Sequence, residues 1–228
     1  MRLLPVLLIA AAACRTAAPG AVVPEAAPAV SAAQVADWVR PTVPTAPRLI
    51  RFKWLFRDDN SSAGGRGSAR IAPPDSLRFD VSGPFGSNAS AAAVVGDSAL
   101  WVQPPDAIKK LVPNYPLMWA LLGVARMPGE GAALRGASED GRTAWEYAAG
   151  ADTIVYVRTT GSTERFMAEV REGGKLIGRV ETTLAADGVP KSSRLTVPSA
   201  PARLDVTFLS AASADSFTAD VWRPRASR

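Results

Sequence analysis

Few residues of this sequence could carry out covalent or metal chemistry. The 228 residues include no histidine and only one cysteine, Cys14. A Ser-His-Asp triad, a Cys-His dyad and a histidine-based zinc site therefore cannot form. A single cysteine also excludes an intrachain disulfide and a thiolate metal cluster. We accordingly expect no metal, no cofactor and no enzymatic activity, and the composition favours a function that needs binding alone.

One serine lies in an enzyme-like motif, the run Gly96-Asp97-Ser98-Ala99-Leu100. This run resembles the GDS-L block of a family of lipase-like esterases, so an esterase that uses Ser98 is one alternative. That family needs a histidine as general base, and this chain has none. Gly-Asp between two apolar runs is also typical of a tight turn, and we predict a hairpin here.

Cys14 directly follows a short apolar run, Leu3 to Ala13, which Arg2 precedes. A bilayer-spanning helix needs about 20 residues, so this run better fits the hydrophobic part of a signal peptide. Small residues that end in a cysteine resemble the bacterial lipobox, whose cysteine is acylated. We predict a signal peptide over 1–13 and lipid attachment at Cys14, with an ordinary secretory signal as the alternative.

The rest of the chain divides by composition into a tether, a domain and a tail. Prolines recur through residues 14–47 and exclude a long helix, so we predict an Ala/Pro-rich tether with a short helix over Ser31 to Arg40. Residues 48–224 form the domain, and 225–228 form the tail. The length suits one domain of ordinary size.

Alternation of apolar and polar residues dominates from Arg48 onward. It predicts an antiparallel sheet of about eleven strands with one apolar face, and a sheet of that size must curl to bury this face. Runs of this kind cover residues 50–56, 77–81, 166–170, 176–184 and 204–208. Turn signals separate the strands at Gly64-Gly65, Gly96-Asp97, Gly173-Gly174 and Asp187-Gly188.

Two helical segments interrupt the alternation between Pro104 and Gly141. Residues Pro105 to Val112 favour a short helix. Residues Tyr115 to Ala125 are apolar nearly all round, which is typical of a buried helix. We predict that this helix lies inside the curl of the sheet; a core helix in a sandwich is the alternative.

The net charge is +5 and the isoelectric point is near 9.8. Lysine and arginine are scattered along the chain and often interleaved with acids, without a basic run. We therefore expect no nucleic-acid partner. Modest basicity of this kind suits an anionic lipid surface equally well.

Three segments, in this order, resemble the LolB family of outer-membrane lipoprotein receptors, of the lipoprotein-localisation pathway. The first is SLRFDVSGPFGS, from Ser76 to Ser87, with its Pro-Phe-Gly loop. The second is the run Trp119-Ala120-Leu121-Leu122-Gly123 with Pro128-Gly129 after it. The third is the set of C-terminal strands around Pro190 and Arg203 to Leu209, which closes with Trp222.

The resemblance implies an incomplete antiparallel β-barrel that wraps around short helices and binds lipoprotein acyl chains passed on by a soluble periplasmic carrier. It implies a monomer, lipid-anchored in the bacterial cell envelope at the outer membrane and facing the periplasm. The alternative is a lipid-binding or lipid-sensing lipoprotein with another cargo or a regulatory partner. The membrane-insertion loop would be Pro84, Phe85 and Gly86. The acyl-chain cavity, for which core packing is the alternative role, would be lined by Phe52, Trp54, Phe79, Trp101, Leu117, Trp119, Leu121, Leu122 and Phe166.

Overall fold

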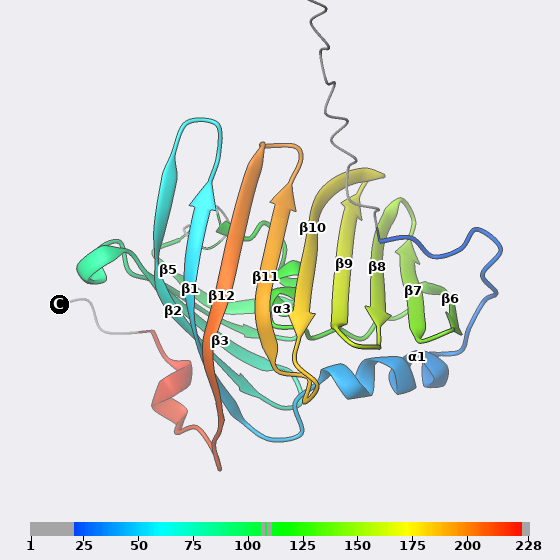
Figure 1. Cartoon of the computed structure of the whole chain (residues 1–228), viewed down its shortest axis with the longest axis horizontal. Helices are drawn as coiled ribbons and strands as arrows, with labels where there is room; N and C mark the ends of the chain where they lie inside the picture. Colours follow the sequence, from blue (N-terminus) through cyan, green and yellow to red (C-terminus); the bar gives the residue numbers. More distant parts are fainter. Residues whose placement is uncertain (1–20, 106–107, 109–110, 225–228) are drawn as a thin grey trace, which may run out of the picture.

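Twelve antiparallel strands form one sheet in the computed structural model, which describes residues 21–105, 108 and 111–224 (Figure 1). The order is β5-β4-β3-β2-β1-β12-β11-β10-β9-β8-β7-β6. The end strands β5 and β6 do not pair with each other within this sheet, so the barrel stays open. The predicted incomplete antiparallel barrel is confirmed, with one strand more than the pattern indicated.

The strands run as two meanders that meet along one seam, where β1 pairs with β12. The first meander consists of β1 (Arg48–Arg57), β2 (Ser62–Ala72), β3 (Ser76–Ser82), β4 (Ser90–Val95) and β5 (Ser98–Gln103). The second consists of β6 (Ala133–Glu139), β7 (Arg142–Ala149), β8 (Asp152–Thr159), β9 (Glu164–Glu172), β10 (Lys175–Leu184), β11 (Pro190–Val197) and β12 (Ala202–Ser213). The segment between β5 and β6 joins the two edges of the open barrel.

Helices cover the concave face, where strand alternation gathers the apolar side chains. The helix α3 (Tyr115–Leu121) packs against β9, β10 and β11, and every residue from Pro116 to Leu121 is buried. This helix is shorter than the predicted Tyr115 to Ala125, because Gly123 takes a left-handed backbone with φ of 77° and turns the chain. The predicted helix over 105–112 lies partly outside the described residues.

The N-terminal helix α1 (Ala32–Val39) confirms the prediction of a short helix. The hydroxyl of Ser31 caps it by accepting a hydrogen bond from the amide of Gln34, and Val35 and Val39 are buried. The 3-10 turn η1 (Arg40–Thr42) follows at once, because Pro41 cannot continue the α-helix.

Residues 21–30 contact the sheet, so the predicted tether does not extend over them. Ala21 and Val23 are buried against outward side chains of β7 and β8. Farther along, the amide of Val30 donates to the carbonyl of Leu134 on β6. The bond of Val30 forms because β6 is an edge strand, whose unpaired backbone groups a passing segment can satisfy. Cys14 and the predicted signal peptide lie outside the described residues.

Gly64 and Gly65 lie inside β2, so the predicted turn at this pair is wrong. The turn lies earlier, where the carboxylate of Asp58 accepts hydrogen bonds from the amides of Asn60 and Ser61. Glycine in this strand permits close packing. A Cβ on Gly67, also in β2, would lie 2.6 Å from the Asp80 carbonyl oxygen. Within the described part of the chain, no helix is both long and apolar enough to cross a bilayer.

Candidate functional site

The concave face and the helix that fills it form the first part of the candidate site. Residues of α3 pack into one apolar cluster with the inward side chains of the sheet. Thr182 on β10 is buried, and its hydroxyl donates to the Ala120 carbonyl at 2.8 Å. At the other side of the helix, the indole of Trp119 donates to the Gly96 carbonyl at 2.9 Å. Two hydrogen bonds therefore hold α3 between β10 and the β4–β5 turn.

The chain that leaves α3 is held by Arg126. Its guanidinium lies 4.8 Å from the centre of the Trp119 ring and forms an ion pair with Asp97 at 3.2 Å. The hydroxyl of Tyr147 donates to the Arg126 carbonyl at 2.9 Å. The hydroxyl of Tyr156 accepts from the Arg126 amide at 3.3 Å. This cluster fastens the exit of α3 to β7, β8 and the β4–β5 turn.

Both tyrosines of this cluster stay protonated. Burial raises the pKa of Tyr156 and of Tyr147 well above the ordinary value for a phenol, since a phenolate would lose its hydration there. A protonated Tyr147 can donate to the Arg126 carbonyl, while its oxygen accepts from the indole of Trp145 at 2.9 Å. At neutral pH the two tyrosine hydroxyls therefore serve as hydrogen-bonding groups that hold the Arg126 backbone in place, and neither ionises.

A hollow of about 250 Å³ opens beside this cluster. Its apolar wall includes Met127, Pro128, Tyr147, Ile154 and Val170. Asn114 also lines it and donates to the carboxylate of Glu172, but its Oδ1 is buried without a hydrogen-bond partner among the described residues. Ligand pockets for small molecules measure roughly 300–1,000 Å³, so the hollow alone is too small for a long acyl chain.

Most of the predicted cavity residues lie together on the concave face, in the packed cluster. The buried ones are Phe52, Phe79, Leu117, Trp119, Leu121, Leu122 and Phe166. None of them lines the four hollows described on this molecule, because α3 occupies the space between the strands. Their role as an acyl-chain cavity stays a prediction, and it requires that α3 move. Trp54 is only half-buried at the edge of this cluster.

Trp101 lies on the opposite face, so its placement among the cavity residues was wrong. It pairs with Ala93 on β4, next to the inward-facing Val102. Its indole donates to the Trp222 carbonyl at 2.7 Å, and the Arg78 guanidinium lies 5.2 Å from its ring centre. The 3-10 turn η3 (Ala219–Trp222) covers it there. Alternation could not reveal this because a distant segment shields the outward face.

The loop between β3 and β4 presents Phe85 to solvent. Phe85 is fully exposed, and its backbone is left-handed with φ of 55°. The turn η2 (Pro84–Gly86) is closed at its base, where the amide of Gly83 donates to the Ser87 carbonyl at 2.7 Å. The Phe85 side chain therefore does not pack back onto the sheet.

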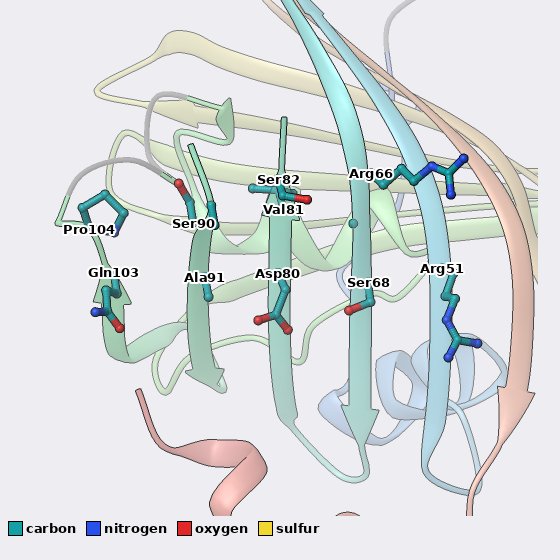
Figure 2. Close-up of a pocket in the computed structure, with 12 residues that line it drawn as sticks. Arg51, Arg66, Ser68, Asp80, Val81, Ser82, Ser90, Ala91, Gln103 and Pro104 are labelled. Carbon is teal, nitrogen blue, oxygen red and sulfur yellow. The ribbon is translucent and has the colours of Figure 1, made fainter. Parts of the chain in front are cut away.

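A second group of exposed residues lies on the convex face and was not singled out from the sequence. Arg51 on β1 and Arg66 on β2 line a hollow of about 520 Å³ that spans β1 to β5. Figure 2 shows both side chains. Asp80 also lines it, and its carboxylate pairs with Arg70 and Arg78. The alternation in β1 and β2 contained the signal for this group, since it points these cations outward together.

The residues considered for catalysis are not gathered into a reactive site. Ser98 is exposed at the start of β5, and Val95 pairs with it across the Gly96-Asp97 turn, which confirms the predicted hairpin. Among the described residues, no three acidic or cysteine side chains lie close enough to hold a metal ion.

Comparisons with known proteins agree on the fold. Neither a protein-family model nor a curated protein sequence gave a significant match. A LolA superfamily protein from Nitrosomonas europaea matches in structure with a TM-score of 0.52 at 10% identity, over 86% of this chain and 99% of that one. A putative outer membrane lipoprotein-sorting protein domain from Vibrio parahaemolyticus matches with a TM-score of 0.55 at 9% identity, over 84% and 97%.

This chain therefore has the open-barrel fold of LolA superfamily structures. The likeness covers nearly the whole length of both solved proteins, so it concerns the overall fold and not a part of it. It is not specific to the LolB receptors that the sequence motifs resemble.

Proposed function

We propose that the protein is a membrane-anchored acceptor that binds lipoprotein acyl chains on its concave face and helps to insert lipoproteins into the outer membrane. The observation that carries this proposal is the combination of an apolar concave face closed by α3 with a separate loop that exposes Phe85. The LolA-superfamily fold and the lipobox-like residues before Cys14 support it. A soluble periplasmic carrier would supply the cargo.

Apolar burial drives binding in this proposal. Each CH₂ group moved from water into the apolar cluster contributes about 0.8 kcal/mol. The same driving force acts in a bilayer, so the acyl chain can pass on when the two environments hold it with similar free energy. No covalent step is needed, and we infer that the protein is not an enzyme.

Entry of an acyl chain requires α3 to leave its place, because the concave face is filled. Besides apolar packing, few polar contacts resist this movement: the bond of Thr182 to Ala120, the bond of Trp119 to Gly96, and the contacts of Arg126. An acyl chain would replace the apolar contacts that α3 gives up, so the sheet residues that α3 uncovers would stay out of water.

Phe85 would act at the membrane in this mechanism. Burial of a large apolar side chain is worth about 1.5–3 kcal/mol, and this energy stays unused while Phe85 points into water. Its loop lies apart from α3 and its anchors. Delivery and uptake can therefore be separated by mutation.

The test of uptake is Thr182→Val, which removes a hydroxyl from the anchor of α3 and nearly conserves the volume. The Thr182 hydroxyl also lies 2.8 Å from the Ser193 hydroxyl on β11, a contact within the sheet that the variant loses whether or not α3 is in place. Loss of the bond to α3 costs the closed state about 1 kcal/mol, so we expect about fivefold tighter apparent binding of a fluorescent long-chain fatty acid. Titration of the full chain measures this change. Native mass spectrometry of the purified protein should also find bound acyl lipid.

The matched control is Thr183→Val, the next residue of the same strand. Its side chain points to the other face and makes no hydrogen bond among the described residues, so binding should stay unchanged. If wild type and both variants bind no fatty acid, the concave face is a plain core and the proposal fails. Uptake without delivery to vesicles would instead indicate a lipid sensor.

A further inference from the structure

Two basic side chains on the convex face lie directly opposite each other on neighbouring strands. Lys53 on β1 and Arg66 on β2 are direct cross-strand partners, and both are exposed. Like charges placed directly opposite each other on neighbouring strands destabilise a sheet. Arg51 lies two residues from Lys53 and points to the same side, which adds a third cation.

Two other cation pairs in this sheet are opposed in the same way, and each has an acid between its members. Arg70 and Arg78 are register partners, and both pair with Asp80, at 3.0 and 2.9 Å. Carboxylates of this kind cancel the repulsion that the strand register imposes.

The second such pair is Arg57 and Arg203, on β1 and β12. Both reach the carboxylate of Asp205, at 3.6 and 2.7 Å. Lys53 and Arg66 differ from these pairs, because neither they nor Arg51 forms an ion pair within the described part of the chain. Among residues 21–105, 108 and 111–224, no carboxylate pairs with Lys53 or Arg66 as an acid does in the other two pairs.

The same two cations share a hollow with the exposed apolar loop. Lys53, Arg66 and Phe85 line one hollow of about 530 Å³ between β1, β2 and η2. Figure 2 shows that Arg66 extends from β2 across β1, on the side where Arg51 lies. Two charged groups and one large apolar group therefore face the same space.

We propose that Arg51, Lys53 and Arg66 bind the phosphate groups of anionic phospholipids while Phe85 enters the apolar layer. A membrane interface offers negative phosphates directly beside hydrocarbon, which matches cations that line one hollow with an exposed phenylalanine. A nucleic acid fits less well, since three cations are few against the six to ten phosphate contacts that are typical. This inference rests on the proposed function. It adds the class of lipid that the Phe85 loop contacts during delivery.

The experiment compares vesicle binding of full-length variants that all carry Cys14→Ser, so that acylation does not contribute. One set of vesicles is phosphatidylcholine alone, and the other is a three-to-one mixture of phosphatidylcholine and phosphatidylglycerol. Each cation near an anionic membrane contributes roughly a factor of five, so changing all three to Ser should lower binding to the anionic vesicles by about 100-fold. Binding to neutral vesicles should stay the same.

The matched control changes Arg165, Lys175 and Lys191 to Ser, which lowers the net charge equally at exposed sites elsewhere on the sheet. This control should keep nearly all of the preference for anionic vesicles. Equal losses in the two triple variants would show that net charge alone matters and would overturn the proposal. Thermal unfolding of both variants verifies that they fold.

Two further measurements separate the outcomes. Binding of a single-stranded oligonucleotide that depends on the same three residues, without a preference for anionic vesicles, would overturn the membrane assignment. Fatty-acid uptake by the triple variant should equal that of wild type, since α3 is untouched. Failure of uptake in wild type would defeat the proposed function and leave the vesicle result standing.

Discussion

At the scale of single residues, Phe85 shows how a short loop can hold an apolar side chain in water. The hydrogen bond between Gly83 and Ser87 closes the loop base, and the Ser87 hydroxyl also donates to the Pro84 carbonyl at 2.8 Å. A left-handed backbone is unfavourable for phenylalanine. Solvent exposure and an unfavourable backbone together point to a role that lies outside the folded core.

We expect Phe85→Glu to leave folding and fatty-acid uptake unchanged but to weaken delivery. An exposed side chain contributes little to stability, so the free energy of unfolding should change by less than about 0.5 kcal/mol. Loss of about 1.5–3 kcal/mol of membrane burial should slow transfer of a bound lipoprotein to vesicles by about 10- to 100-fold. A transfer assay with labelled cargo measures this.

Two variants control this prediction. Phe85→Leu keeps an apolar side chain and should retain most of the transfer. Leu100→Glu places the same charge at another exposed apolar residue, on β5, and should transfer like wild type. Normal delivery by Phe85→Glu would show that the loop has no part in insertion.

At the scale of elements, β2 shows why a glycine pattern can mislead. Glycine pairs often mark turns, but here Gly64, Gly65 and Gly67 lie within one strand. A side chain at Gly67 would collide with the ring of Phe52 and the backbone at Asp80. The requirement for glycine arises from neighbouring elements, so the local sequence could not distinguish it from a turn.

We expect Gly67→Ala to destabilise the protein by about 1–3 kcal/mol, because the added methyl group overpacks the contact with Phe52 and Asp80. Urea unfolding measures the change. Gly129→Ala is the control: its Cβ would meet open space, so stability should hold or rise slightly. If the two variants were equally stable, the close approach of Gly67 would have no energetic weight.

The helix α3 was predicted correctly as an element, but its C-terminal limit was not. An apolar surface all round correctly indicated a buried helix, since only burial satisfies such a surface. Its end at Leu121 follows from the left-handed turn at Gly123. Its contacts with Thr182 and Gly96 join residues far apart in the chain, which no local period encodes.

At the scale of the whole molecule, the seam between β1 and β12 unites the two meanders. Asp205 on β12 lies at this seam and accepts from Arg194 on β11 at 2.9 Å and from Arg203 at 2.7 Å. It also pairs with Arg57 on β1. Partial burial raises the pKa of Asp205, but the arginines outweigh this and hold the pKa below its usual value of 3.8.

We expect Asp205→Asn to lower the free energy of unfolding by about 1 kcal/mol at neutral pH, a modest value because solvent screens these pairs. A carboxylate with a lowered pKa in the folded state stabilises fully above its unfolded pKa, and this stabilisation is lost as the pH falls through the folded value. The difference from wild type should thus be constant above about pH 5 and shrink below about pH 4. Urea unfolding across this range measures it.

Asp215→Asn is the control for this pH dependence, because Asp215 is exposed and makes no ion pair among the described residues. Its stability should follow wild type at every pH. A difference for Asp205→Asn that stayed the same in acid would show that the effect is not electrostatic.

The sequence by itself determined the antiparallel sheet with one apolar face, the turn at Gly96-Asp97, the buried helix inside the curl of this sheet and the lack of histidine chemistry. These follow from local periods, turn propensities and composition, which act between residues close in the chain. Only the tertiary structure decided that Trp101 faces outward beneath η3 and that Lys53 and Arg66 share a hollow with Phe85. These arrangements depend on strand order and on contacts between distant segments, and a repeating pattern along one strand carries no information about either.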